Sequence, residues 1–523
     1  MPRYYRPLLM ATVFTTGASV LIFEIIAVRA LAPYFGASMY VVSSVLTVVL
    51  AALSIGYYIG GRLADQYPDA RFLYGLLSLG GFLMSLLYVI FSLMATVMSA
   101  YFPITIGPLI ITLLFFFMPA FLLGIDSPFV IKLLTIERKN NDDSGTTAGS
   151  TYFWSTLGSI MGSLLTGFLF IPFFGVDVTV FATATSLTVL SFFAYVTVSD
   201  FLPGSVKIFK QSHFIIFILG SLFCAVLILD VDNLVAYKEN KVLFSKDGYY
   251  SHITVLERFE SPTKVVRSLV RDVNHSSAIM LGSTEFMFQY TEYARVYRAL
   301  QDETKSFLMI GGGAYSIPRT LILEDPVLEI DVVEIEPGLY DLAQKYFDLP
   351  TSERLTNYTM DARVYLNRTD MKYDFIFVDV FSSGLFIPSH LTTVEFVNEL
   401  KQHLNTQGVL VVNIVGVIDK NERSLTGSLV KTFQSVFPEL RVYNASNNQV
   451  GLKNFILVAK KDGTPSELPA DFEIDLKNSH VVSAATRMLP LDTLYLEKQI
   501  VFTDDKAPVE LLLTKQMLNL KSD

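Results

Sequence analysis

Long apolar runs fill the first 232 residues and decide what this chain can fold into. Each run is about as long as a helix that crosses a bilayer, roughly 20 residues. The runs lie near residues 9–33, 41–61, 73–96, 104–125, 149–173, 176–198 and 213–231. The chain of 523 residues is 51% hydrophobic, more than an ordinary soluble protein. The sequence therefore predicts a transmembrane helical domain of about seven spans over residues 1–232.

The order of charges between these runs predicts an orientation. The first run begins too abruptly for a cleavable signal peptide, so we expect it to remain in the mature protein. Lys and Arg gather in alternate connections, which by the positive-inside rule places the N-terminus in the cytoplasm. The basic residues are Arg3, Arg6, Arg62, Arg71, Lys132, Arg138, Lys139, Lys207 and Lys210.

Seven spans that start inside would deliver everything after residue 232 to the outside. That conflicts with the cytosolic metabolite that the motifs below require. Either one run is not a full span, or the charge rule fails here, or the C-terminal part faces out. We expect an integral protein of the plasma membrane with its C-terminal domain in the cytoplasm.

Composition excludes several classes of site. The single cysteine, Cys224, rules out a disulfide framework and a Cys-based zinc site. Six histidines without a His-Glu-x-x-His spacing predict no metal site. A net charge of −9 gives no reason to expect a nucleic-acid surface, which would need a basic face.

After the apolar half the pattern changes twice. Short β-rich runs predict a small antiparallel β domain over residues 240–290. From residue 306, continuous apolar strands alternate with amphipathic helices, which is typical of a parallel sheet covered on both faces. We therefore predict a Rossmann-like, doubly wound α/β domain over residues 291–523, with ligands at the carboxyl ends of the strands.

A glycine-rich turn marks the ligand edge of this sheet. Gly311, Gly312 and Gly313 close the first strand and let a ligand approach the backbone where a Cβ would clash. Glu334 ends the second strand, where a carboxylate can accept both hydroxyls of a ribose. The pair Asp361-Ala362 follows the third strand region and could hold an adenine ring. Together they predict an S-adenosyl site; the alternative is a turn with two surface acids.

Asp379 ends the apolar run "FIFVD", so its carboxylate should lie at the same edge. There it could act as a general base or hold a cationic amine, or it could simply cap a helix. His390 follows in "FIPSHLTT", which we interpret first as a loop and helix start. In the first span, Glu24 and Arg29 are ionisable groups at membrane depth, which indicates either a substrate path or an internal ion pair.

The motifs of the C-terminal half resemble, in order and spacing, the spermidine synthase (polyamine aminopropyltransferase) family. They read "MIGGGAYSIPRTLI", "DVVEIEPGLYDLAQKYF", "MDARVYL", "YDFIFVDVF" and "TQGVLVVNI". Upstream, "DGYYSHITV", with Tyr250, is similar to the family's Ser-x-Tyr-Gln-x-Ile element, and "FQYTEYARV", with Tyr290, to its Tyr-His-Glu element. The N-terminal spans, with "FEIIAVRALAPYFG" and "SIGYYIGGRLAD", look like the branch in which this domain is fused to a membrane bundle. So do "IPSHLTTVEF" and "FTDDKAPVE".

The resemblance implies transfer of an aminopropyl group from decarboxylated S-adenosylmethionine to a polyamine, with release of methylthioadenosine. It implies no tightly bound cofactor, only the S-adenosyl co-substrate. It places the glycines at the cradle, Glu334 on the ribose, Asp361 and Ala362 at the adenine, and Asp379 as the base that activates the attacking amine. In that family the small β domain mediates dimers, so a homodimer is a further expectation.

Three departures from the family pattern concern the amine end. The family reads Gly-Gly-Gly-Asp-Gly-Gly, whose acid helps hold the donor's amine, and here that position is Ala314. Ser382 stands where a second acid belongs near the base, and Ser251 replaces the upstream Gln. Acids elsewhere in the chain could substitute, and the candidates are Asp272, Glu292, Asp504 and Asp505.

Three functions remain open at this point. The first is a membrane-bound aminopropyltransferase. The second is another reaction of S-adenosylmethionine at the same cradle, either methyl transfer or cleavage without an acceptor, which Ala314 favours because intact S-adenosylmethionine carries a carboxylate there. The third is a transporter or sensor that binds a polyamine or nucleoside without turnover, which Glu24 motivates.

Overall fold

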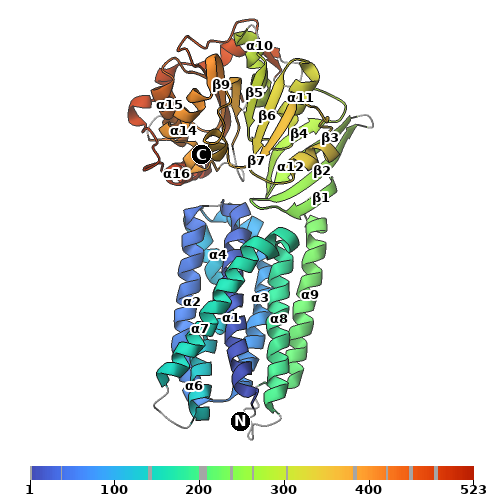
Figure 1. Cartoon of the computed structure of the whole chain (residues 1–523), viewed down its shortest axis with the longest axis vertical. Helices are drawn as coiled ribbons and strands as arrows, with labels where there is room; N and C mark the ends of the chain where they lie inside the picture. Colours follow the sequence, from blue (N-terminus) through green and yellow to red (C-terminus); the bar gives the residue numbers. More distant parts are fainter. Residues whose placement is uncertain are drawn as a thin grey trace. The chain divides into compact units, whose positions relative to one another are not determined.

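The computed structural model describes residues 3–36, 38–138, 144–199, 209–235, 240–261, 264–301, 304–380, 386–419, 422–446, 451–475 and 481–522. The chain divides into two compact units, Met1–Lys238 and Glu239–Asp523. The first unit is helical, and the second combines sheets with helices (Figure 1). We describe each unit by itself.

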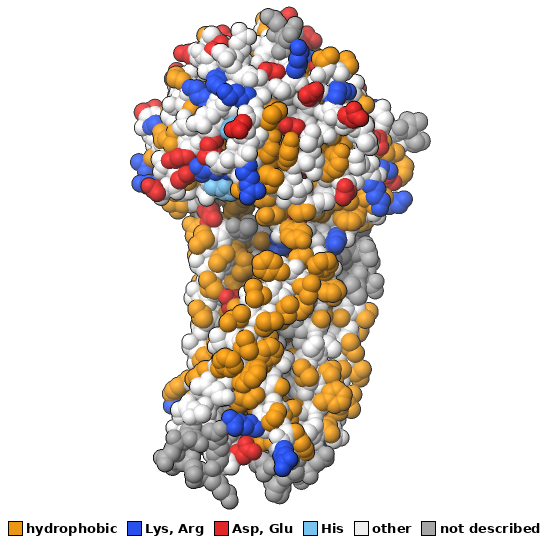
Figure 2. Space-filling view, viewed as in Figure 1, with side chains coloured by type: hydrophobic (Ala, Val, Ile, Leu, Met, Phe, Trp, Pro, Cys, Tyr) orange, Lys and Arg blue, Asp and Glu red, His pale blue; other side chains and the backbone are white. Residues whose placement is uncertain are grey.

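The helical unit contains long apolar helices. Their bounds are α1 Tyr5–Phe35, α2 Met39–Gln66, α3 Ala70–Tyr101, α4 Gly107–Phe115, α5 Phe117–Gly124, α6 Asp126–Arg138, α7 Ser144–Leu165, the π-helix η2 Thr166–Phe170, α8 Ile171–Ser199 and α9 Gln211–Val235. In the described part of the chain, five helical stretches are long and apolar enough to cross a membrane. Hydrophobic side chains cover most of the visible face of this unit (Figure 2). A membrane segment is thus supported.

The predicted number of seven spans stays a prediction. One of the five stretches, Ser144–Ser199, is 56 residues long, nearly three times what a single crossing needs. The backbone departs from helical geometry inside it, at Gly175, where φ is 81°. The segment Gln211–Leu227 forms a shorter apolar helix.

Small residues let α1 and α7 pack closely. A Cβ on Gly158 would lie 2.0 Å from the carbonyl oxygen of Phe14, and a Cβ on Gly17 would lie 2.2 Å from that of Ser155. Gly158 and Gly162 stand four residues apart on one helix face, a spacing common where membrane helices touch. Larger side chains at these positions would force the two helices apart.

The described residues show no ion pair between Glu24 and Arg29, the two ionisable groups of α1 that the sequence analysis considered. Glu24 is half-buried. Asp126, at the start of α6, is fully buried and accepts a hydrogen bond from the hydroxyl of Thr16. The sequence analysis did not single out Asp126.

The second unit begins with a four-stranded antiparallel sheet in the order β1-β2-β3-β4. Its strands are β1 Lys241–Asp247, β2 His252–Ser261, β3 Lys264–Arg271 and β4 Asn274–Met280. Its inner residues, such as Val255 and Leu269, belong to the same hydrophobic core as Phe307 of the larger sheet. The small sheet is therefore packed into the second unit and shares its core.

The larger sheet has eight strands in the order β14-β10-β11-β9-β8-β5-β6-β7. Their bounds are β5 Ser306–Ile310, β6 Glu329–Glu334, β7 Leu355–Thr359, β8 Tyr373–Val378, β9 Leu404–Gly416, β10 Arg441–Asn444, β11 Lys453–Lys460 and β14 Met488–Leu489. The strands from β7 to β9 are parallel, as predicted. The sequence analysis did not predict the antiparallel part of the sheet, in which β11 pairs with β9, β10 with β11, and β14 with β10.

Helices cover both faces of this sheet (Figure 1). Successive strand residues alternate between two cores: Phe307 and Met309 enter one, and Leu308 and Ile310 enter the other. The first core contains residues of α11 Ser316–Glu324 and α12 Leu339–Tyr346. The second contains residues of α13 Ala362–Leu366, α14 Val394–Gln402, α15 Leu425–Val436 and α16 Val509–Ser522. Burial on both faces explains the continuous apolar strands.

The strand order reverses between β5 and β8, which are neighbours in space but not in sequence. In open α/β sheets a ligand binds beside the carboxyl ends of the strands at such a switch point. Gly311 follows β5 and Asp379 follows β8. The topology thus brings the glycine-rich turn and the predicted base to one place.

Candidate active site

A cavity of about 540 Å³ lies at this switch point. It is lined by the glycine-rich turn and by residues from the ends of β6 and β8, the start of α13 and the hairpin of β3 and β4. Seven of the predicted nucleoside and catalytic residues line it: Gly311, Gly312, Gly313, Glu334, Asp361, Ala362 and Asp379. Positions that the sequence predicts independently therefore meet at one cavity.

The glycine-rich turn passes very close to the strand end that carries Asp379. Gly311 has a φ of 92°, and a Cβ there would lie 2.0 Å from the carbonyl oxygen of Asp379. The backbone N–H of Asp379 donates to the carbonyl of Ile310 at 2.8 Å. Gly313 also has a positive φ, 53°. Any side chain at Gly311 would separate the two loops that form the floor of the cavity.

Glu334 ends β6 and is 4% exposed. One of its carboxylate oxygens accepts the backbone N–H groups of Gly312 at 2.8 Å and Gly313 at 3.0 Å, and the other accepts that of Glu336 at 2.9 Å. The carboxylate thus holds the turn in shape. Because each oxygen has two lone pairs, the second oxygen retains capacity for a ligand hydroxyl.

Asp361 lies at the start of α13 and already has partners for both oxygens. Its Oδ1 accepts the backbone N–H groups of Arg363 at 2.9 Å and Val364 at 3.1 Å, which is an N-cap. Its Oδ2 lies 2.8 Å from Nε2 of His390, and this bond lowers the pKa of the Asp361 carboxyl. Ala362 is buried beside it.

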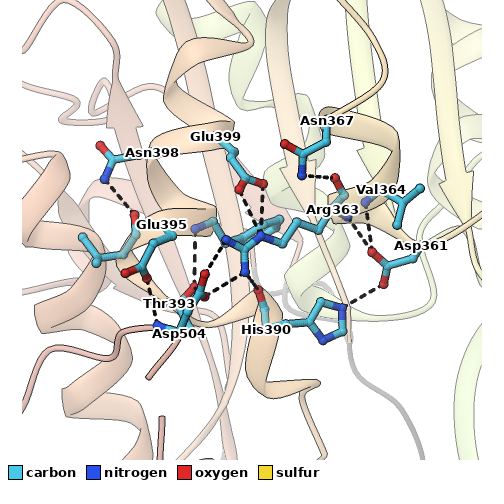
Figure 3. A network of polar contacts seen from close by, with 12 residues as sticks. Asp361, Arg363, Val364, Asn367, His390, Thr393, Glu395, Asn398, Glu399 and Asp504 are labelled. Atoms are coloured by element: carbon cyan, nitrogen blue, oxygen red, sulfur yellow. Dashed lines mark hydrogen bonds and ion pairs between the residues drawn. The ribbon is translucent and has the colours of Figure 1, made fainter. Parts of the chain in front are cut away.

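An ion-pair network fixes this end of the cavity (Figure 3). Arg363 pairs with Glu399 at 3.0 Å and with Asp504 at 2.8 Å, and the carbonyl of His390 accepts from its Nη1 at 3.3 Å. Asp504 also accepts from the hydroxyl of Thr393 at 2.7 Å, and the Arg363 bond lowers the Asp504 pKa. Asp504 is therefore occupied in joining the C-terminal segment to α13.

Asp379 is held by two neutral hydrogen-bond donors. The hydroxyl of Tyr290 donates to Oδ2 at 2.9 Å, and Nδ2 of Asn413 donates to Oδ1 at 2.9 Å. The amide of Asn413 is itself oriented by Nδ2 of Asn454, which donates to its oxygen at 2.9 Å. Burial raises the pKa of Asp379, the two donors oppose that rise, and the charge of Glu334 adds to it. Burial likewise raises the pKa of Tyr290.

The other residues that the sequence analysis suggested for the amine end either do not line the cavity or lie outside the described residues. Tyr250 is 53% exposed, and only its backbone N–H contacts Glu336; it does not line the cavity. Asp272 accepts the backbone N–H of His252 at 2.9 Å and also lies outside the cavity lining. Glu292 pairs with Arg295. Ser382 lies outside the described residues.

Several polar residues that line the cavity were missed by the sequence analysis, among them Asn413, Asn454 and Arg271. Asn413 and Asn454 orient Asp379, and Arg271, at the end of β3, lines the cavity with a side chain that is 8% exposed. A signal for Asn413 existed, because it is the single polar residue in the apolar run "VLVVNIV". Arg271 had no such signal, because the run "SLVRDV" contains two other polar residues, Ser268 and Asp272.

Comparison with known proteins agrees with this geometry. Residues 287–461 match the family model of the spermine/spermidine synthase domain. The chain is 30% identical over 238 residues to a polyamine aminopropyltransferase of Vibrio vulnificus, which spans 43% of this chain and 76% of that protein. The chain belongs to the spermine/spermidine synthase family. The resemblance of its motifs is thereby confirmed, and membership places the chain among transferases.

Other relatives are more distant or longer. A probable polyamine aminopropyl transferase of Bifidobacterium longum is 32% identical over 241 residues, which cover 43% of this chain and 52% of that protein. A probable spermidine synthase of Corynebacterium glutamicum, known from a crystal structure, is 24% identical, with a TM-score of 0.37, and the match covers 42% of this chain and 80% of that one. The family match lies within the second unit of this chain.

Proposed function

We propose that the chain is a membrane-bound aminopropyltransferase, which transfers an aminopropyl group from decarboxylated S-adenosylmethionine to a polyamine and releases methylthioadenosine. The observation that carries this proposal is Asp379: a half-buried carboxylate at the switch point of the sheet, held by Tyr290 and Asn413 and lining a cavity. In this proposal the donor and a polyamine are the small-molecule partners.

The carboxylate suits the chemistry of amine attack. A primary amine has a pKa near 10, so at pH 7 it must lose a proton before it can attack the carbon next to the sulfonium. Burial raises the pKa of Asp379 toward the working pH, which makes it a stronger base than an exposed aspartate. Its hydrogen bonds to Tyr290 and Asn413 fix the direction in which it accepts the proton.

The other half of the cavity suits a nucleoside. In our proposal the sugar hydroxyls bind the free capacity of Glu334, and the adenine lies against Ala362 with its amino group toward Asp361. The glycine-rich turn supplies close backbone approach. Holding donor and acceptor side by side in this way contributes roughly 7 to 11 kcal/mol to lowering the barrier.

The direct test uses the whole chain purified in detergent. It is incubated with S-adenosylmethionine or with its decarboxylated form, each with and without putrescine or spermidine, and the products are identified by mass spectrometry. Release of methylthioadenosine that requires the polyamine supports the proposal. Formation of S-adenosylhomocysteine would indicate methyl transfer instead, and tight binding without any product would indicate a transporter or sensor.

We further propose that the apolar helices anchor this activity at the plasma membrane, with seven spans and the catalytic unit in the cytoplasm. The support is the length and apolar character of the helices and the need for a cytosolic donor. A cysteine placed at the exposed Lys264 tests the side, because the natural Cys224 is buried. An impermeant thiol reagent should label this cysteine only after the cells are permeabilised; labelling in intact cells would place the unit outside.

A further inference from the structure

Arg271 is a buried cation of the cavity that the reaction proposed above does not use. Its side chain is 8% exposed and lines the cavity. Its Nε donates to the hydroxyl of Ser251 at 3.1 Å. Among the residues that the structure describes, no carboxylate oxygen forms an ion pair with its guanidinium.

The nearest negative charge is already engaged elsewhere. Burial raises the pKa of Glu336, and the charge of Arg271 opposes that rise, so the two side chains interact electrostatically. Both oxygens of Glu336, however, accept backbone N–H groups of the loop before β2. These bonds come from Tyr249 at 2.6 Å, Tyr250 at 2.8 Å and Ser251 at 3.1 Å. Glu336 therefore holds this loop through backbone N–H groups, and no ion pair joins it to Arg271 among the described residues.

A guanidinium in this situation is suited to an anionic ligand. Burying a charge without a hydrogen-bonded counter-charge is costly, so a ligand that supplies one gains affinity. The planar fork of N–H donors matches a carboxylate, and a single Nε bond to Ser251 leaves its Nη edge free for such a pair. The cavity thus contains a preformed subsite for a carboxylate.

Arg271 lies in the part of the cavity where, in our proposal, the tail of the donor binds. Arg271 pairs with Asn274 in the hairpin of β3 and β4, and the same hairpin covers the glycine-rich turn through Ser277. Ser277 lies 3.6 Å from the position of a Cβ on Gly313, and its hydroxyl is 3.0 Å from that of Ser316 at the start of α11. This turn is where the family's acid would hold the amine of the donor.

That acid is missing here, whereas the cation Arg271 lines the same cavity. Ala314 is 2% exposed and belongs to the hydrophobic core, so it offers the cavity no charge. A decarboxylated donor would bring a lone ammonium group to this end, close to the guanidinium of Arg271. An intact amino-acid tail would bring a carboxylate as well, which the guanidinium attracts.

We propose that Arg271 binds the carboxylate of intact S-adenosylmethionine, so that this molecule also serves as a donor and the group transferred from it is 3-amino-3-carboxypropyl. The inference rests on the amine attack proposed above. The lone pair of the acceptor nitrogen forms a bond to the carbon next to the sulfonium. The carbon–sulfur bond breaks, its electron pair stays on sulfur, and methylthioadenosine leaves. The proton of the acceptor ammonium passes to Asp379.

The test compares two donors in two variants of the whole chain. Arg271→Met removes the charge and keeps most of the side-chain volume; Lys264→Gln removes a charge from an exposed position of the same strand and serves as the control. With spermidine as acceptor, the wild type should form from S-adenosylmethionine a product that is heavier, by the mass of one CO2, than that formed from the decarboxylated donor. Arg271→Met should lose about ten- to a hundredfold in kcat/KM for S-adenosylmethionine, as expected for a charge-assisted bond, and keep or gain activity with the decarboxylated donor.

Binding to the wild type gives a second measurement that does not depend on the variant's folding. Calorimetry should show tighter binding of S-adenosylhomocysteine than of its decarboxylated analogue, by about tenfold or more. Equal affinities, or equal loss of both donors in Arg271→Met while methylthioadenosine still binds, would overturn the inference and leave the aminopropyl reaction standing. If neither donor releases methylthioadenosine, the proposed function fails together with it.

Discussion

The two ends of the cavity use their charged groups differently. At the nucleoside end, Glu334 and Asp361 are already bonded to the chain itself, the first to the glycine-rich turn and the second to α13 and His390. At the end where we propose that the amine binds, Asp379 accepts from two neutral donors, Tyr290 and Asn413, and Arg271 lines the cavity. Substitutions at the first end should therefore affect binding and folding together, whereas those at the second should affect turnover or donor choice.

The largest effect is expected for Asp379→Asn. The variant keeps the shape of the side chain but cannot take a proton, so turnover should fall by about a hundredfold to ten-thousandfold, the range of general-base contributions. Methylthioadenosine should still bind, because Asp379 does not belong to the nucleoside end. Steady-state kinetics and calorimetry on the same preparation measure both quantities.

The control for this variant is Asp370→Asn, an exposed aspartate in the loop before β8. It should leave both turnover and binding at the level of the wild type. If Asp379→Asn keeps full activity, the base has been assigned to the wrong residue.

The next largest effect is expected at the other end, for Glu334→Ala. The variant removes the carboxylate that we propose binds the sugar, and it leaves three backbone N–H groups without their acceptor: those of Gly312 and Gly313 in the turn and that of Glu336. Binding of methylthioadenosine should weaken by about a hundredfold or more, and unfolding should become easier by about 1 to 3 kcal/mol. Calorimetry and thermal unfolding in detergent measure the two effects.

Glu329→Ala on the same strand is the matched control, because its side chain is exposed. It should change neither quantity. A Glu334 variant that loses turnover but binds the nucleoside normally would show that Glu334 does not act in nucleoside binding, and the two ends of the cavity would then not differ as proposed.

A smaller effect is expected for Asn413→Ala. Removing this donor frees the orientation of Asp379, and turnover should fall about tenfold, the effect of one hydrogen bond to a charged group. The bond from Asn413 lowers the pKa of Asp379, which burial has raised. Since the base must be ionised, activity falls as the pH drops through this pKa, and in the variant that decline should begin at higher pH. If the loss of activity in acid instead begins at lower pH in the variant, Asp379 is not the base that Asn413 holds.

The smallest effect is expected for His390→Ala. His390 lowers the pKa of Asp361, so its bond contributes stability above the ordinary pKa of an aspartate, about 3.9, and that contribution is lost as the pH falls through the lowered value. The variant should therefore unfold more easily than the wild type at pH 7, by about 1 kcal/mol, and the difference should shrink in acid. Thermal unfolding at several pH values shows whether it does; a difference that grows in acid would speak against this role of His390.

The sequence predicted the elements whose pattern is local. Continuous apolar strands, the glycine-rich turn after β5 and the acids that end β6 and β8 all follow from short segments, and the structure places them together. The antiparallel strands at the edge of the sheet were missed. β10 has four residues and β14 two, and the pairings of β10 with β14 and of β9 with β11 join segments far apart in the chain.

The site was predicted in position but not in its contacts. Nothing in the spacing of Glu334 showed that its carboxylate would hold the glycine-rich turn, because that depends on which way backbone N–H groups point. Asn413 and Arg271 were missed for a related reason. Asn413 is one polar residue in an apolar run, and Arg271 ends a strand that carries other polar residues. Only the fold shows that both line the cavity.

The measurement that tests the account most directly is the release of methylthioadenosine by the detergent-purified chain, with and without a polyamine, in the wild type and in Asp379→Asn. The account predicts release by the wild type only when the amine is present, and release at least a hundredfold slower in the variant. Release that is indifferent to the amine, or that survives in Asp379→Asn, would contradict it.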